Sequence, residues 1–187
     1  MYYRMDSDRV TQNIYLERES HPRVKMISGS PLPDTTTGPF VFNMSVGKDE
    51  EGRETEPLMF AFIPTPCVMH KNFLETLRAA GVDNIQAFPA VLNETRNGRQ
   101  WTDYVAANIV GLVSCANVAK SKATPLADVY YFHNLVIDPS KTGDLLLFRL
   151  AESQTTIIVH EKVAAAIEAA NFEGVVLEPL SEEPTAE

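Results

Sequence analysis

The sequence predicts an α+β fold, a mostly antiparallel sheet with two main helices in repeated helix-turn-strand units. In the run Phe73–Pro89, apolar residues recur at helical spacing, and Gly81 follows where a helix end favours the left-handed conformation. A weaker copy is Ile167–Val176, in which Asn171 takes the place of Gly81. An extended stretch follows each turn, so we expect each unit to continue into a strand.

Residues 1–40 are predicted to be largely irregular, although Tyr2–Met5 could form a short strand. The part between Ser28 and Pro39 is rich in turn formers and is predicted to be a surface loop. Two extended runs follow, Phe40–Val46 and Leu58–Ile63, and the acidic segment Gly47–Glu56 separates them. This pattern predicts a β-hairpin with a long acidic loop.

The middle of the chain predicts one helix and a second hairpin. Pro66 suits the first turn of a helix, which we expect over about Cys67–Ala80. The strand Ile85–Leu92 then leads into a turn at Asn97-Gly98, a pair that tolerates positive φ. The return strand is expected over Trp101–Val113, with a bulge or close backbone approach at Gly111.

The last third predicts a polar crossing, three strands, a helix and a final strand. In order, these segments are Ala116–Asp128, Val129–Ile137, Leu145–Leu150, Thr156–Val159, Glu161–Ala170 and Val175–Glu178. Residues 180–187 are expected to be a disordered acidic tail. The length of 187 residues suits one domain, so we assign residues 1–187 to a single domain.

The charge of the chain bears on its partners. The net charge is −9 and the pI is about 4.9. An acidic surface disfavours nucleic acid and is compatible with a basic protein partner, although acidity often serves solubility alone. No apolar run reaches the roughly 18 residues of a membrane span, and the first residues lack a signal segment. We therefore expect a cytoplasmic protein with no nucleic-acid or membrane partner.

The sequence contains no phosphate loop, dinucleotide fingerprint or nucleophile elbow. Cys67 and His70 offer at most half of a metal site, because zinc needs three or four ligands. The other candidates complete no second half by spacing: His21, Cys115, His133 and His160. We expect no metal, no cofactor and no enzymatic activity. Two cysteines are too few for a disulfide scaffold, so both are expected to be semi-buried thiols.

Three residues keep a chemical alternative open. Cys67 near a predicted helix start would have a lowered thiol pKa and could act as a nucleophile beside a histidine. His133 lies in an apolar strand and is expected to be a hydrogen-bonded core residue. Arg149 shares a strand with apolar residues, so it is expected to pair with a buried carboxylate rather than to bind an anion. The candidate carboxylates are Asp83, Asp144 and Glu152.

Four blocks together resemble a known family: Gly81–Leu92, Ala107–Val113, Leu145–Ser153 and Thr155–Gly174. Their order and spacing are similar to those of immunity protein family eleven of bacterial polymorphic toxin systems. That family was formerly a domain of unknown function, and its type member comes from a myxobacterium. The resemblance covers about Pro64–Pro179 and carries no catalytic motif.

The resemblance implies an antidote that binds a cognate toxin domain and blocks it. A nuclease toxin would be basic, and an acidic immunity protein would attract it. The expected toxin-binding residues lie in the acidic loop: Asp49, Glu50, Glu51, Glu54 and Glu56. Two other classes remain open. One is an adaptor or chaperone that delivers an effector, and the other is an enzyme that uses Cys67 or Arg149.

Overall fold

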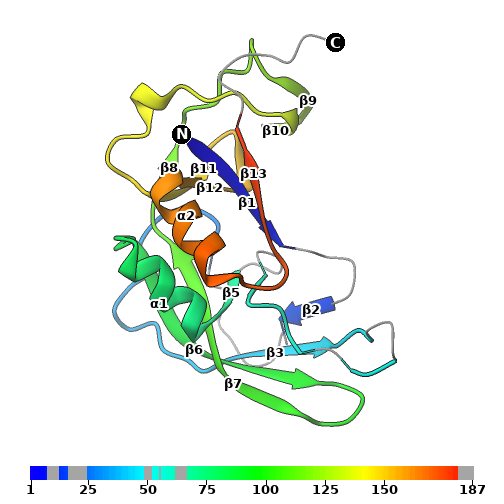
Figure 1. Ribbon diagram of the computed structural model, residues 1–187. Coiled ribbons are helices and arrows are strands. Elements are labelled where there is room, and N and C mark those ends of the chain that lie inside the picture. The colour runs from blue at the N-terminus through cyan, green and yellow to red at the C-terminus, as the bar shows by residue number, and fades with distance from the viewer. Residues whose placement is uncertain (8–12, 17–24, 49–51, 55, 62–66, 181–187) are drawn as a thin grey trace.

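The computed structural model describes residues 1–7, 13–16, 25–48, 52–54, 56–61 and 67–180. These residues form a six-stranded sheet, a five-stranded sheet, a separate two-stranded sheet and two α-helices. Figure 1 shows the two helices side by side against the strands, with the two-stranded sheet at the opposite end of the molecule from the long β6–β7 hairpin. The α+β class with mostly antiparallel strands is confirmed.

The six-stranded sheet contains the long hairpin. Its strands, in sheet order, are β2 (Asn13–Leu16), β3 (Phe40–Ser45), β6 (Ile85–Glu94), β7 (Gln100–Ile109), β5 (Cys67–His70) and β4 (Phe60–Ala61). All neighbours are antiparallel except β3 and β6, which are parallel. The turn between β6 and β7 forms as predicted, with Gly98 at φ 73°.

The five-stranded sheet brings the two ends of the chain together. Its strands, in sheet order, are β13 (Val175–Pro179), β1 (Tyr2–Ser7), β12 (Ser153–His160), β11 (Leu147–Leu150) and β8 (Leu112–Val113). β9 (Lys122–Leu126) and β10 (Val129–Asn134) form the two-stranded sheet. A short 3-10 turn at Pro139–Lys141 follows, and the Asp138 side chain caps it by accepting the N–H of Ser140.

Each helix connects two strands that lie on either side of a third strand. α1 (Lys71–Ala79) joins β5 to β6, which flank the antiparallel β7. α2 (Glu161–Ala170) joins β12 to β13, which flank the antiparallel β1. The buried faces of the two helices belong to one core cluster with residues of both sheets. These faces consist of Phe73, Leu74 and Leu77 on α1 and of Val163, Ala164 and Ile167 on α2.

The predicted repeat of helix-turn-strand units is not found. α1 ends at Ala80 in the right-handed conformation, and Gly81 then adopts φ 104°. α2 ends at Asn171, which itself takes the left-handed conformation. The strands that follow also differ, because β6 lies inside the six-stranded sheet and β13 is the edge of the other sheet. Similar helix-end sequences therefore lead into different surroundings.

The predicted hairpin of Phe40–Val46 and Leu58–Ile63 is wrong. β3 pairs with β2 and β6, whereas β4 pairs with β5 and forms the opposite edge of the same sheet. The prediction assumed that strands close in sequence are neighbours, but β6, β7 and β5 lie between these two. Residues 62–66 lie outside the described part of the chain.

Three further boundaries differ from the prediction. Residues 1–40 are less irregular than predicted: the expected short strand at Tyr2–Met5 forms as part of β1, inside the five-stranded sheet, and β2 is a further strand in the six-stranded sheet. The segment Cys67–His70 is a strand, so the first helix starts at Lys71. The polar crossing Ala116–Asp128 contains β9, whose strand character comes from pairing with β10 rather than from its composition. The predicted tail lies mostly beyond the described residues.

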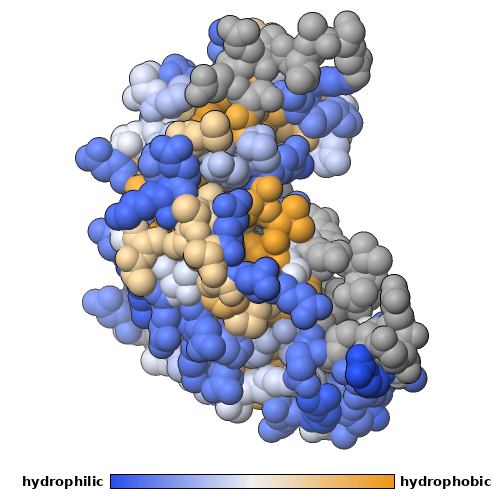
Figure 2. Space-filling model, in the orientation of Figure 1, coloured by the Kyte–Doolittle hydropathy of each residue, from blue (hydrophilic) through white to orange (hydrophobic). Residues whose placement is uncertain are grey.

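Apolar and polar surfaces are unevenly distributed. In Figure 2, hydrophilic side chains cover the lower end of the molecule around the β6–β7 hairpin, and apolar side chains reach the surface around α2 and β13. No helix in the described ranges combines the length and apolar character that crossing a membrane requires.

Candidate interaction site at the acidic loop

The described C-terminal end of the acidic loop contacts the turn region of the β6–β7 hairpin. Glu54 and Glu56 are described, whereas Asp49, Glu50 and Glu51 lie outside the described residues. The backbones of Lys48 and Glu54 form an isolated antiparallel bridge, which closes the base of the loop. The structure therefore gives a position to two of the five predicted toxin-binding residues.

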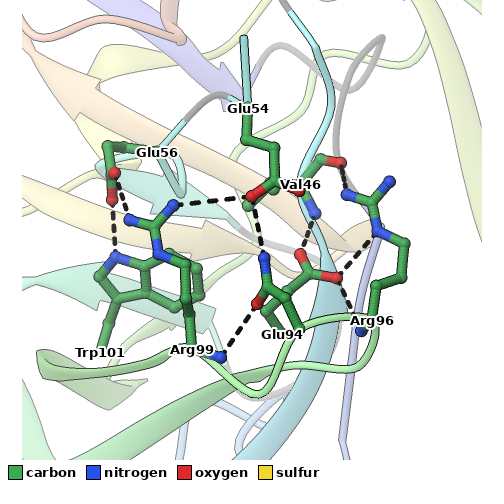
Figure 3. A network of polar contacts seen from close by, with 8 residues as sticks. Val46, Glu54, Glu56, Glu94, Arg96, Arg99 and Trp101 are labelled. Carbon is green, nitrogen blue, oxygen red and sulfur yellow. Dashed lines mark hydrogen bonds and ion pairs between the residues drawn. The ribbon is translucent and has the colours of Figure 1, made fainter.

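Arg99 and Trp101 hold Glu56 on the surface of the hairpin. Arg99 Nη2 donates to Glu56 Oε1 at 2.5 Å, and the indole Nε1 of Trp101 donates to Glu56 Oε2 at 2.6 Å. The guanidinium carbon of Arg99 also lies 4.7 Å from the Trp101 ring centroid, a cation–π distance. Both oxygens of one carboxylate are thus engaged by two adjacent side chains (Figure 3).

Glu54 is held by the same turn. Asn97 Nδ2 donates to Glu54 Oε2 at 2.9 Å, and Arg99 Nη1 lies 3.8 Å from the same oxygen. The Asn97 side-chain oxygen also accepts the backbone N–H of Arg99, which fixes the tight turn. We call Glu54, Glu56, Asn97, Arg99 and Trp101 the loop clamp. It ties Glu54 and Glu56, at the described end of the acidic loop, to the β6–β7 hairpin.

A buried carboxylate supports the loop clamp from beneath. Glu94, the last residue of β6, is only 1% exposed. Its Oε2 accepts the N–H of Val46 at 2.7 Å, and its Oε1 accepts the backbone N–H and the Nε of Arg96 at 3.1 and 3.0 Å. Arg96 in turn donates to the carbonyl of Val46 at 2.6 Å. Glu94 and Arg96 therefore join the end of β3 to the hairpin (Figure 3).

The electrostatics of these groups favour the ionised carboxylates. The hydrogen bond from Arg99 lowers the pKa of Glu56 below its ordinary value, and Trp101 adds to this effect. Burial raises the pKa of Glu94, but the hydrogen bonds from Arg96 and the N–H of Val46 outweigh it and leave that pKa below its ordinary value. Glu54 and Glu56 keep exposed oxygens, while Arg99 offsets part of their charge.

Sequence reasoning selected the acidic side of this site and missed its basic side. The sequence predicts a turn at Asn97-Gly98 but not the contacts that Arg96 and Arg99 make beside it. Alternating acidic and basic residues around a tight turn were the available signal, because such residues often pair locally. Trp101 is predicted only as the first residue of the return strand, and its contact with Glu56 is not foreseen.

Arg149 does not pair with a carboxylate in the described part of the chain. It is 1% exposed, its Nη1 donates to the carbonyl of Gln154 at 2.9 Å, and its Nη2 lies 3.1 Å from Cys67 Sγ. Its Nε has no hydrogen-bond partner. Glu152, one of the predicted partners, instead accepts from Ser114 at 2.7 Å. The prediction of a carboxylate partner for Arg149 is wrong.

The structure also places the other candidates for chemistry. Cys67 and Cys115 are buried thiols, as predicted. Burial raises the pKa of the Cys67 thiol despite the opposing charge of Arg149, and burial raises that of Cys115 to about 12. The predicted lowering by a helix start does not apply, because Cys67 lies in β5. His133 is exposed and contacts Thr124 at 3.0 Å, so the prediction of a core histidine is wrong.

Two observations complete the search for a site. In the described ranges, no three histidine, cysteine, aspartate or glutamate side chains are grouped to hold a metal ion. A cavity of about 290 Å³ lies between β1, β10 and β12, with Arg4, Asp6, Tyr131 and Thr156 among its lining residues. Arg4 is already engaged there by Glu178.

No known family model matches this chain, and no curated protein sequence matches it.

Proposed function

We propose that this protein is an immunity protein, which binds the toxin domain of a cognate bacterial effector and neutralises it by protein–protein contact in the cytoplasm. The resemblance of Gly81–Leu92 and the later blocks to immunity protein family eleven supports the class. The net charge of −9 is compatible with a basic toxin.

The observation that carries the proposal is that Glu54 and Glu56 are exposed and yet held by the loop clamp. Glu54 and Glu56 keep 35% and 65% of their side-chain surface exposed, although Arg99 and Trp101 hold them in place. A pre-ordered acidic surface loses less conformational entropy on binding than a free loop does. In this proposal the toxin contacts Glu54 and Glu56 together with Asp49, Glu50 and Glu51, and Trp101 is the nearest aromatic anchor.

Co-expression with the toxin encoded by the adjacent gene tests the class. Host survival together with a co-purified complex is the expected result. A complex that forms without rescue would instead favour an adaptor or chaperone. Absence of both, with the protein folded, would contradict the proposal.

Association kinetics test the surface. Glu56→Lys is expected to lower the association rate constant by about tenfold at low salt, with a smaller effect at high salt. Glu168→Lys is the matched control, since Glu168 is exposed on α2 and forms no ion pair in the described part of the chain. Equal rates for the two variants would remove the acidic loop from the proposed interface.

A second variant separates the effect of negative charge on association from the effect of holding Glu54 and Glu56 in place. Arg99→Ala breaks the loop clamp while it makes the surface more acidic. If charge dominates, Arg99→Ala associates at least as fast as the unmodified protein. If the ordered loop dominates, Arg99→Ala dissociates faster.

Cys67 and Arg149, the two residues named for the enzyme alternative, are both buried. The Cys67 side chain is 0% exposed and the Arg149 side chain is 1% exposed, so neither is placed where a substrate would reach it. Their mutual contact instead joins β5 to β11 across the two sheets.

A further inference from the structure

The cavity between β1, β10 and β12 lies where two neighbouring strands separate. The pairing of β1 with β12 runs from Tyr2 opposite His160 to Met5 opposite Ile157. Beyond Met5, the register partners of β1 in the described part of the chain lie on β13. Residues 154–156 of β12 line the cavity in part and have no partner on the β1 side.

A β-bulge separates the same stretch of β12 from its other neighbour. β11 pairs with Ile157 through Arg149 and with Ser153 through Leu150, so the register jumps across residues 154–156. Within the described ranges, these residues have no register partner in any strand. Bulges often end strand pairing next to functional sites. A short stretch of strand backbone therefore borders a cavity instead of another strand.

The lining of the cavity offers neutral hydrogen-bonding groups. Arg4 is paired with Glu178, and its Nη1 lies 3.4 Å from the carbonyl oxygen of Phe132. Asp6 accepts the backbone N–H of Ser7 at 2.7 Å. The protein thus already engages both charged residues, so the cavity suits a neutral ligand with donors and acceptors rather than an ion. Four lining side chains carry hydroxyl groups: Tyr131, Ser153, Thr155 and Thr156.

Two exposed apolar side chains border the cavity. Tyr131 lines it and is 58% exposed. Val176 on β13 is 46% exposed and is the register partner of Asp6, so it lies on the same face of the sheet as that lining residue. Exposed aromatic and aliphatic side chains beside polar groups can anchor a protein partner.

We propose that this cavity binds an extended segment of a partner protein, which adds as a short strand beside residues 154–156 and packs against Tyr131 and Val176. Strand addition supplies the main-chain donors and acceptors that neighbouring strands do not supply here. The volume of about 290 Å³ is near the lower limit for ligand pockets, so the cavity admits only a short part of the segment.

This site is separate from the loop clamp. β10 belongs to the two-stranded sheet, which lies at the opposite end of the molecule from the β6–β7 hairpin (Figure 1). The lining residues and the members of the loop clamp have no residue in common. The inference therefore does not depend on toxin binding at Glu54 and Glu56, and its test uses peptides and no toxin.

Selection of random linear peptides displayed on phage, with the unmodified protein as bait, tests the site. Enriched peptides are synthesised, and their Kd is measured by fluorescence polarisation. Thr155→Phe fills the cavity from an exposed position and should weaken binding by about tenfold or more, as the loss of about two hydrogen bonds would. Thr102→Phe, at an exposed threonine of β7 outside the cavity, is the matched control and should bind as the unmodified protein does. Failure to enrich any peptide, or equal affinity for Thr155→Phe and the unmodified protein, would overturn the proposal.

Two measurements on the unmodified protein test strand addition itself and cover the case in which Thr155→Phe does not fold. Forms of a selected peptide with N-methyl groups on alternate backbone amides lack the donors on one edge, so one of the two forms should lose binding. Bound peptide should also slow amide hydrogen exchange at residues 154–156. Equal binding of both methylated forms and the unmethylated peptide, or unchanged exchange at these residues, would contradict strand addition.

Discussion

Glu94 and Arg149 are both charged and both 1% exposed, but their surroundings differ sharply. Glu94, at the end of β6, accepts three hydrogen bonds and faces the guanidinium of Arg96. Arg149, in β11, has one backbone carbonyl, one sulfur atom and an Nε without a partner. Both residues are equally buried, but the hydrogen-bonding groups of Glu94 all have partners, whereas those of Arg149 have partners only in part.

The difference shows why burial alone does not rank charged residues. A buried charge that is paired and hydrogen-bonded recovers most of its lost hydration, and one without a counter-ion does not. We therefore expect Glu94 to contribute to stability through its charge and Arg149 to contribute mainly through the volume that its side chain fills.

Removal of the Arg149 side chain should have the largest effect. Arg149→Ala leaves a cavity between the two sheets and should lower the free energy of unfolding by about 2–5 kcal/mol. Arg149→Met fills much of the same volume without a charge and should be neutral or stabilising by up to about 4 kcal/mol. Urea denaturation measures both variants. A methionine variant as unstable as the alanine variant would show that the charge itself stabilises the fold.

Removal of the Glu94 carboxylate should have the second-largest effect on the free energy of unfolding. Glu94→Ala leaves the N–H of Val46 without its acceptor and should cost about 2–4 kcal/mol, whereas Glu94→Gln keeps one acceptor and should cost less. Glu75→Ala, at an exposed position on α1, is the control and should stay within about 0.5 kcal/mol. If Glu94→Ala and Glu75→Ala unfold at the same urea concentration, the Glu94 carboxylate does not stabilise the fold.

The dependence of stability on acidic pH tests the role of the Glu94 charge in a second way. The folded pKa of Glu94 lies below the unfolded value, so its stabilisation is present above the unfolded pKa and is lost as the pH falls through the folded pKa. Glu56 acts in the same direction. Stability should therefore fall below about pH 4.5, and Glu94→Gln should flatten this part of the curve. If the stability of Glu94→Gln falls with pH in parallel with that of the unmodified protein, Glu94 does not cause the loss of stability in acid.

The smallest expected effect is local to the loop clamp. Trp101 is the single tryptophan of the chain, and its indole donates to Glu56. Glu56→Gln weakens the contact with Arg99 and should shift Trp101 fluorescence towards longer wavelengths, because the ring gains contact with water. The global unfolding midpoint should barely change, since exposed ion pairs contribute little to stability. An unchanged spectrum would mean that the loop clamp does not hold Trp101.

Local signals in the sequence identified several elements well. The apolar spacing of Val163 and Ile167 predicted α2 over the residues that the structure assigns to it. Asn97-Gly98 predicted the turn between β6 and β7, in which Gly98 alone of the pair takes a positive φ, 73°. The acidic loop was also recognised, but its partners Arg99 and Trp101 were not, because the contacts across 43 and 45 residues depend on the fold.

The sequence by itself determined the α+β class, the apolar face of the first helix, the β6–β7 turn and the acidic character of the candidate site, because each depends on residues close together in the chain. The tertiary structure decided the neighbours of β3 and β4, the position of β1 inside a sheet, the partners of Arg149 and the arrangement of the loop clamp. Strand pairing and the compensation of buried charge depend on residues far apart in the chain, and one sequence read locally does not specify which distant groups meet.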